Sequence, residues 1–298
     1  MYCCGIVHPM TPLTMCMGLG CNAVGVTGCR IIGSRRERFA AMVTNCFIPC
    51  NGRFSMLITL SALFVGGIFG KGMQAPAAAL FVLFLIGVGA VATLGITKAL
   101  TRVFPGNEEI GFSLELPPLR KPQVVKTLVR SLLDRTWKIL SRAIRISAPA
   151  GAVIWLMANL QAGEASLLAV CANFLQPLGT LMGMDGVILL AFLLALPANE
   201  IVLPIILMGY LATGQMADIT DLTALGELLR ANGWTACTAV NVMLFSLLHF
   251  PCATTLWTIQ KESGSVLWMA AGFAIPTCLA VAVCMGVHGI WQLLALLI

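Results

Sequence analysis

The chain has 298 residues, of which 59% are hydrophobic and only 10% are charged, whereas a soluble globular domain usually carries about 25% charged residues. Its apolar residues form long uninterrupted blocks, and this excludes a protein that has water as its main solvent. The net charge of +6 comes largely from two clusters, Arg30–Arg38 and Arg120–Arg145, so a nucleic acid is not expected as a partner. We therefore expect an all-α fold, a polytopic transmembrane helical bundle surrounded by membrane lipid.

The twelve cysteines lie mostly inside apolar segments and not in loops. This placement indicates reduced thiols, because a disulfide framework is typical of short secreted chains. Most of these cysteines are expected to fill helix interfaces as small apolar side chains. No cleavable signal peptide is expected, since Met1–Gly20 has no positive amino-terminal region.

The first apolar segments are interrupted. Residues 13–29 carry four glycines and the pair Cys21-Asn22, which predicts a broken or re-entrant helix. The run Phe39–Gly70 is long enough to span a membrane but contains Pro49-Cys50-Asn51-Gly52-Arg53, where proline removes an intrahelical donor. Ala75–Leu100 has a single charged residue and predicts a complete span, since roughly 20 apolar residues cross the hydrocarbon layer.

The segment 101–145 is polar, and basic residues recur at helical spacing within Val124–Ile146. That pattern predicts an amphipathic helix on the inner membrane surface. The positive-inside rule then places both basic clusters in the cytoplasm. A helix of this kind can alternatively dock a partner protein, and the sequence leaves both interpretations open.

The second half repeats the plan of interrupted apolar blocks. These blocks lie at 146–162, 166–182, 186–213, 236–250 and 266–298. The block 186–213 is interrupted at Leu196-Pro197-Ala198-Asn199-Glu200, and 236–250 runs into Pro251-Cys252. The polar and acidic segment Gln215–Asn232 is predicted to be a loop on the outer face.

Two of the interruptions match each other across the halves. Phe47–Gly52 and His249–Thr254 both end an apolar run with Pro-Cys. Paired broken helices in corresponding positions are expected where a transporter builds its binding site at the interface of two repeats. Four polar breaks result, the first at Cys21-Asn22, the second at Cys50, the third at Cys252 and the fourth at Asn199-Glu200.

The side chains at these breaks form a mixed soft and hard donor set. A carboxylate such as Glu200 within an apolar block costs several kcal/mol unless it is paired, protonated or bound to a metal. Thiolates, carboxylate and amide oxygens together suit a borderline divalent ion such as Fe²⁺, Mn²⁺ or Zn²⁺. The candidate metal ligands are Cys21, Asn22, Cys50, Asn199, Glu200 and Cys252.

Structural roles remain open for each candidate. The asparagines can hydrogen-bond neighbouring helices, the cysteines can be packing residues, and Glu200 can be a neutral hydrogen-bonding acid. His249 lies beside Pro251-Cys252, and Cys46 would share a face with Cys50 on an unbroken helix. No hydrolase, zinc-protease or dinucleotide motif is present, so neither catalysis nor a resident cofactor is expected.

Four motifs in order give the chain a family resemblance. They are Gly18-Leu19-Gly20-Cys21-Asn22 followed by Ser34–Arg38; Pro49-Cys50-Asn51-Gly52-Arg53; Glu115-Leu116-Pro117-Pro118; and Pro251-Cys252-Ala253-Thr254-Thr255 with Lys261-Glu262-Ser263-Gly264. With these motifs the chain resembles the carboxy-terminal membrane half of the ferrous-iron transporter B family, FeoB. The resemblance implies a multi-pass protein of the bacterial cytoplasmic membrane, with gate-type domains at 1–100 and 146–298 and a cytoplasmic linker at 101–145. It also implies a ferrous-iron path that uses Cys21, Cys50 and Cys252, with Asn199-Glu200 at the polar break of the second gate.

The chain also departs from the family pattern. Family members normally begin with a cytoplasmic GTP-binding domain and further membrane helices, and neither precedes the first motif here. The sequence therefore predicts Fe²⁺ import by a non-enzymatic chain, which takes a separate GTP-binding chain or a second copy of itself as a possible partner. The alternative is a non-transporting membrane subunit that is active only with such a GTPase chain or with the missing helices. A nucleoside transporter is less favoured, because only two Tyr and six Trp are available for stacking.

Overall fold

The computed structural model describes residues 11–68, 72–103, 125, 128–129, 133, 137–162, 165–211 and 221–297. Within these residues the chain is helical apart from two strands of two residues each, β1 (Gln161–Ala162) and β2 (Ala165–Ser166), which pair antiparallel. The predicted all-α class is therefore confirmed. Most of the predicted linker 101–145, including Glu115-Leu116-Pro117-Pro118, lies outside the described residues.

The helices follow the predicted interruptions. Those of the first half are α1 (Thr11–Gly20), α2 (Asn22–Gly28), α3 (Arg35–Thr44), α4 (Asn51–Leu60) and α5 (Gln74–Val103), with the short helical turns η1 (Cys29–Ile31), η2 (Asn45–Phe47), η3 (Ser61–Val65) and η4 (Gly66–Ile68). Those of the second half are α7 (Trp137–Asn159), α8 (Leu167–Leu181), α9 (Gly186–Leu194), η6 (Asn199–Ile201), α10 (Val202–Leu211), α11 (Leu222–Ala231), α12 (Ala236–Leu248), α13 (Ala253–Ser263) and α14 (Val266–Leu297).

Several of these helices are long and apolar enough to cross a membrane. In the described part of the chain they are Arg35–Val65, Gln74–Val103, Ala236–Ser263 and Val266–Leu296. The pair α8 and α9 adds a fifth candidate, bent by 111° at a short break. The chain is thus a multi-pass membrane protein, as its composition predicts.

The apolar block 146–162 lies within α7, which begins at Trp137 and is not among the candidate spans of the described residues. One sequence prediction is wrong in detail. The predicted loop Gln215–Asn232 contains α11 instead. This helix starts at Asp221, whose side chain accepts a hydrogen bond from the Thr223 N–H, and such a cap makes the polar segment helical.

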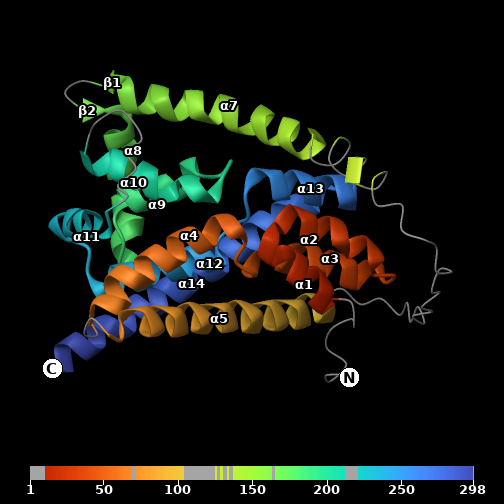
Figure 1. Ribbon diagram of the computed structural model, residues 1–298, viewed down its shortest axis with the longest axis horizontal. Helices are drawn as coiled ribbons and strands as arrows, with labels where there is room; N and C mark the ends of the chain where they lie inside the picture. The colour runs from red at the N-terminus through yellow and green to blue at the C-terminus, as the bar shows by residue number, and fades with distance from the viewer. Residues whose placement is uncertain are drawn as a thin grey trace.

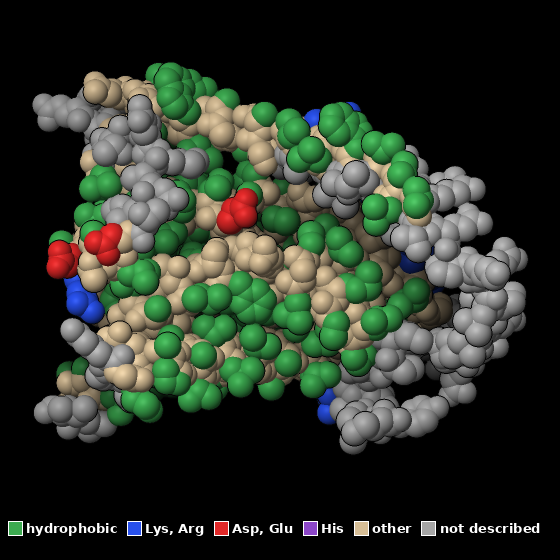
Figure 2. Space-filling view, viewed as in Figure 1, with side chains coloured by type: hydrophobic (Ala, Val, Ile, Leu, Met, Phe, Trp, Pro, Cys, Tyr) green, Lys and Arg blue, Asp and Glu red, His purple; other side chains and the backbone are tan. Residues whose placement is uncertain are grey.

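The helices form a bundle with α12 near its middle. Figure 1 shows α5 along one side and α7 along the opposite side, with α4, α12 and α14 between them. The most apolar stretch of Ala236–Ser263 is 72% buried inside the protein, against 17% for both Gln74–Val103 and Val266–Leu296. Hydrophobic side chains are spread over the face seen in Figure 2, where charged ones are sparse. We infer that α5 and α14 face lipid.

Close backbone contact holds the second break, at Cys50, against α5. A Cβ atom on Gly89 would lie 2.3 Å from the Phe47 carbonyl oxygen, so only glycine allows α5 to approach η2 this closely. Phe47 is fully buried, and it belongs to the main hydrophobic core together with Leu57, Leu247 and Val242. This contact fixes η2 in place only a few residues before Cys50.

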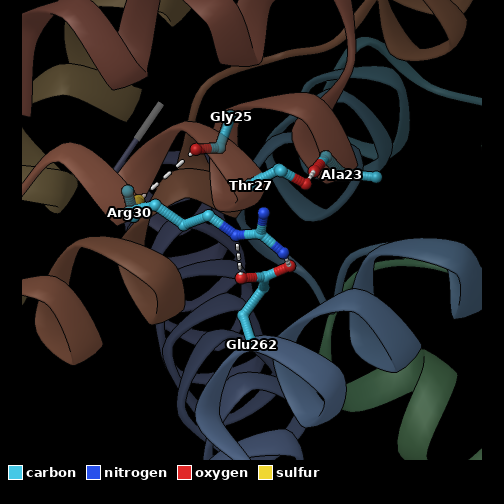
Figure 3. A network of polar contacts seen from close by, with 6 residues as sticks. Ala23, Gly25, Thr27, Arg30 and Glu262 are labelled. Carbon is cyan, nitrogen blue, oxygen red and sulfur yellow. Dashed lines mark hydrogen bonds and ion pairs between the residues drawn. The ribbon is translucent and has the colours of Figure 1, made fainter. Parts of the chain in front are cut away.

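An ion pair joins the two halves at the basic end of the bundle. The Arg30 guanidinium donates two hydrogen bonds to the Glu262 carboxylate, from Nε at 2.5 Å and from Nη2 at 2.6 Å. Figure 3 shows the two side chains meeting between η1 and the carboxyl end of α13. The helices α2 and α13, which follow Cys21 and Cys252, are therefore tied at their far ends.

Candidate metal path at the helix breaks

Three candidate cysteines occupy the same structural position. Cys21, Cys50 and Cys252 each stand directly before a helix, α2, α4 and α13 respectively, and none of their side chains caps that helix. Five other helices of the described chain begin with an oxygen-bearing cap. These caps are Ser34, Ser166, Asp185, Asp221 and Thr235. Oxygen side chains are the preferred caps, so a thiol at all three breaks is not explained by helix initiation.

Proline and extended backbone make the breaks. Cys21 is extended, with φ −157° and ψ 124°, between α1 and α2. Pro49 and Pro251 each precede a cysteine, and neither can donate to the preceding helix. Both Cys50 (φ −83°, ψ 169°) and Cys252 (φ −59°, ψ 157°) therefore lie in non-helical backbone. The predicted broken helices are confirmed at these three places.

The three thiols converge although they come from distant parts of the sequence. All three side chains are half-buried and reduced. The Cys252 thiol lies within electrostatic range of both Cys50 and Cys21, and α2 packs against α13. The structure thus brings together the cysteines that the sequence singles out.

Buried amides connect the first break to the second. The Asn45 side chain donates from Nδ2 to the Asn22 carbonyl oxygen at 3.0 Å. Oriented so that its nitrogen and not its oxygen faces these acceptors, the Asn22 amide donates to the carbonyl oxygens of Ile48 at 3.2 Å and of Gly18 at 3.1 Å. Asn22 is 2% exposed. Its amide nitrogen is therefore engaged in structure, and only its oxygen remains for a cation.

A buried arginine connects the second break to the third. Arg53 is 0% exposed. Its Nη1 donates to the carbonyl oxygens of Cys46 at 2.7 Å and Leu247 at 3.1 Å, and its Nη2 donates to those of His249 at 3.2 Å and Phe250 at 2.8 Å. One side chain of the first half thus holds the backbone just before Cys50 and just before Cys252.

The fourth break joins the same group. The Ala253 N–H, at the start of α13, donates to the Leu196 carbonyl oxygen at 2.7 Å. A methyl group on Gly52 would stand 3.8 Å from the Glu200 carboxylate oxygen Oε2, so Glu200 lies over the start of α4. The break at Asn199-Glu200 therefore lies next to both Pro-Cys breaks.

The two side chains of this break differ in burial. Asn199 is 8% exposed, and its Oδ1 atom has no hydrogen-bond partner among the described residues. The Glu200 side chain is exposed. The prediction of a buried carboxylate is therefore wrong for this chain. The turn η6 directs the Asn199 side chain into the core and the Glu200 side chain away from it.

The convergence does not amount to a closed metal site. Among the described residues, no group of three or more His, Cys, Asp and Glu side chains is arranged to hold a metal ion together. Cys46 does not act with Cys50, because η2 and Pro49 interrupt the helix that would place them on one face, and the Cys46 thiol donates to the Val43 carbonyl oxygen at 3.2 Å. The ligands available are thus separate thiols, an amide oxygen and an exposed carboxylate.

His249 has a structural environment. It is 1% exposed, and its Nδ1 atom contacts the carbonyl oxygens of Phe245 at 2.8 Å and Ser246 at 2.9 Å, so this nitrogen carries the proton. The rings of Phe192, Phe245 and Phe250 pack around it. The imidazole thus fills an aromatic cage.

Sequence reasoning did not single out Arg53 beyond its place in a motif. The available signal was a lone arginine within the apolar run 39–70, since a cation inside a membrane span needs specific partners. Of the four carbonyl partners, Cys46 is 7 residues away, and Leu247, His249 and Phe250 are 194 to 197 residues away in the chain. No pattern of side chains in the sequence indicates which backbone carbonyls will accept these hydrogen bonds.

Two family comparisons cover most of the chain. A family described as "Nucleoside recognition" matches residues 140–266, and one described as "Ferrous iron transport protein B C terminus" matches residues 80–135. Curated relatives align with nearly all of it. Over these regions the chain is similar to the carboxy-terminal membrane half of FeoB. The predicted resemblance is therefore confirmed.

The curated relatives are named Fe(2+) transporter FeoB. The Staphylococcus aureus (strain COL) protein is 28% identical over 274 residues, which cover 89% of this chain and 38% of the relative. The Synechocystis protein is 26% identical over 263 residues, covering 87% of this chain and 40% of the relative. The Methanocaldococcus jannaschii protein is 26% identical over 278 residues, which cover 88% of this chain and 38% of the relative. The chain thus spans about two fifths of the length of the FeoB proteins it matches.

No solved structure matches the chain. The nucleoside-recognition match overlaps the predicted second gate-type domain, 146–298. The boundaries at 100 and 145 stay predictions.

Proposed function

We propose that this chain provides a transmembrane path for Fe²⁺ import, in which the ion passes between ligands at the helix breaks. The observation that carries the proposal is the convergence of Cys21, Cys50 and Cys252, each at the uncapped start of a half-helix. The name Fe(2+) transporter of the curated relatives supports the choice of ion. Thiolate ligands suit Fe²⁺ better than Mg²⁺ or Ca²⁺, which prefer oxygen.

An incomplete site suits an ion that has to leave again. A closed set of four ligands holds a structural metal tightly, whereas conduction requires binding that is weak enough to release the ion. In the proposed path the thiols replace part of the ion's water shell, and the free Oδ1 of Asn199 offers a further oxygen. The exposed Glu200 carboxylate attracts the cation at the edge of this group of breaks.

Uptake of radioactive ⁵⁵Fe²⁺ by cells that express this chain tests the proposal. Cys21→Ser, Cys50→Ser, Cys252→Ser and Glu200→Gln are each expected to lower uptake while membrane insertion is retained. Cys278→Ser is the matched control, because Cys278 is exposed on α14. If all four variants take up iron like the control, the proposed path is wrong.

A further inference from the structure

Arg53 supplies donors that the helix breaks remove. In an unbroken helix the Leu247 carbonyl would accept from residue 251, but Pro251 has no N–H. The His249 carbonyl would accept from residue 253, but the Ala253 N–H is turned to Leu196. Arg53 donates to both of these carbonyls. The guanidinium therefore replaces the missing backbone donors at the third break while it also bonds Cys46 at the second.

The positive charge of Arg53 is balanced by the dipoles of the backbone carbonyl groups that it contacts. Among the described residues, Arg30 and Glu262 form an ion pair, and Arg53 forms no ion pair. A buried charge needs good geometry and hydrogen bonding; Nη1 and Nη2 of Arg53 make four bonds to carbonyl oxygens, while its Nε has no partner among the described residues. The rigid, planar fork of a guanidinium can reach carbonyls on two sides at once, which the single ammonium of a lysine cannot.

The second Pro-Cys motif has no counterpart of this arginine. In Pro251-Cys252-Ala253-Thr254-Thr255 the residue in the place of Arg53 is Thr255. Its hydroxyl lies 3.3 Å from the Cys252 sulfur and so acts within its own break. One arginine therefore serves both breaks.

We propose that Arg53 is a positioning residue for the metal path, which holds the Cys50 and Cys252 breaks at one separation so that both thiols reach the same ion. The inference rests on the proposed function, since the two thiols are metal ligands only there. Arg53 itself is not a ligand of the ion, because a guanidinium carries only N–H donors and has no acceptor to offer a cation. Loss of the cross-link is expected to spread the thiols and to weaken metal binding.

Co²⁺ binding to the purified, reduced chain in detergent tests this proposal, because thiolate ligation of Co²⁺ gives a charge-transfer absorption band. Arg53→Lys is expected to weaken Co²⁺ binding by about 10- to 100-fold, the range typical of residues that orient metal ligands, and to lower the band toward that of Cys50→Ser/Cys252→Ser. Tyr210→Phe is the control: it removes the hydrogen bond that Trp234 shares with Tyr210, away from the breaks, and it is expected to keep both binding and band.

The outcomes separate the two proposals. Wild-type binding and band in Arg53→Lys, together with their loss in Cys50→Ser/Cys252→Ser, would overturn the role of Arg53 alone. Wild-type behaviour of the double serine variant would overturn both proposals.

A second variant covers the case in which Arg53→Lys does not fold. Pro251→Ala gives the Leu247 carbonyl a backbone donor and so takes one acceptor from Arg53. It is expected to weaken Co²⁺ binding, whereas Pro177→Ala, at a proline inside α8, is not. Equal binding by these two proline variants would overturn the proposal.

Discussion

Replacing Gly89 by alanine is expected to disturb the second helix break from the outside. The added Cβ would stand 2.3 Å from the Phe47 carbonyl oxygen, about 1 Å inside an ordinary contact distance, and this neighbour is backbone that cannot rotate away. Overpacking of this kind costs about 1–3 kcal/mol. The displaced η2 precedes Cys50, so we expect weaker metal binding as well as lower stability.

Gly87→Ala is the matched control for this prediction. It makes the same change on the same helix, and a Cβ there meets nothing within 4 Å. Because the gain in helix propensity from glycine to alanine is common to both variants, their difference isolates the contact with Phe47. The assay is thermal unfolding in detergent followed with a thiol-reactive dye. A melting temperature of Gly89→Ala equal to or above that of Gly87→Ala would refute the packing argument.

Three further predictions concern the ends of helices. Arg30→Ala removes an ion pair whose side chains are 64% and 9% exposed. The loss of stability in melting experiments should be at most about 1 kcal/mol and should shrink in high salt. A loss of stability that does not depend on salt would contradict this. Ser34→Ala removes the cap of α3 and should cost about 1 kcal/mol, whereas an unchanged melting temperature would show that the cap contributes nothing. Hydrogen bonds from Thr223 lower the pKa of Asp221, so the stabilisation from its carboxylate is present above the pKa of the unfolded chain and is lost as the pH falls through the lower folded pKa. Asp221→Asn should therefore melt below wild type at pH 7 and not at strongly acidic pH, and a difference that persists in acid would argue against this origin.

The broken helices could be predicted because their causes are local. Pro49 and Pro251 remove backbone donors, and the glycine-rich segment around Cys21 permits extended backbone, whatever the rest of the chain does. The helix α5 could be predicted equally well, because its apolar block is long and uninterrupted. By contrast, α11 depends on the Asp221 cap within a polar segment. The sequence of that segment is equally typical of a loop.

The environment of the site could not be predicted, because it depends on contacts between distant segments. The sequence shows that Glu200 lies in an apolar block, but only the turn at η6 decides that Asn199 faces inward and Glu200 outward. Similarly, the four acceptors of Arg53 are backbone atoms that no residue type identifies. Sequence reasoning therefore named the candidate ligands and did not identify Arg53 as the residue that joins the Cys50 and Cys252 breaks.

Anaerobic Fe²⁺ binding to the purified, reduced chain tests the central claim most directly. Wild type is compared with Cys21→Ser/Cys50→Ser/Cys252→Ser, and a matched triple variant, Cys16→Ser/Cys171→Ser/Cys278→Ser, replaces exposed or half-buried cysteines elsewhere. The account predicts that Fe²⁺ binding is lost in the first triple variant and kept in the second. Binding that survives without Cys21, Cys50 and Cys252 would contradict a metal path at the helix breaks.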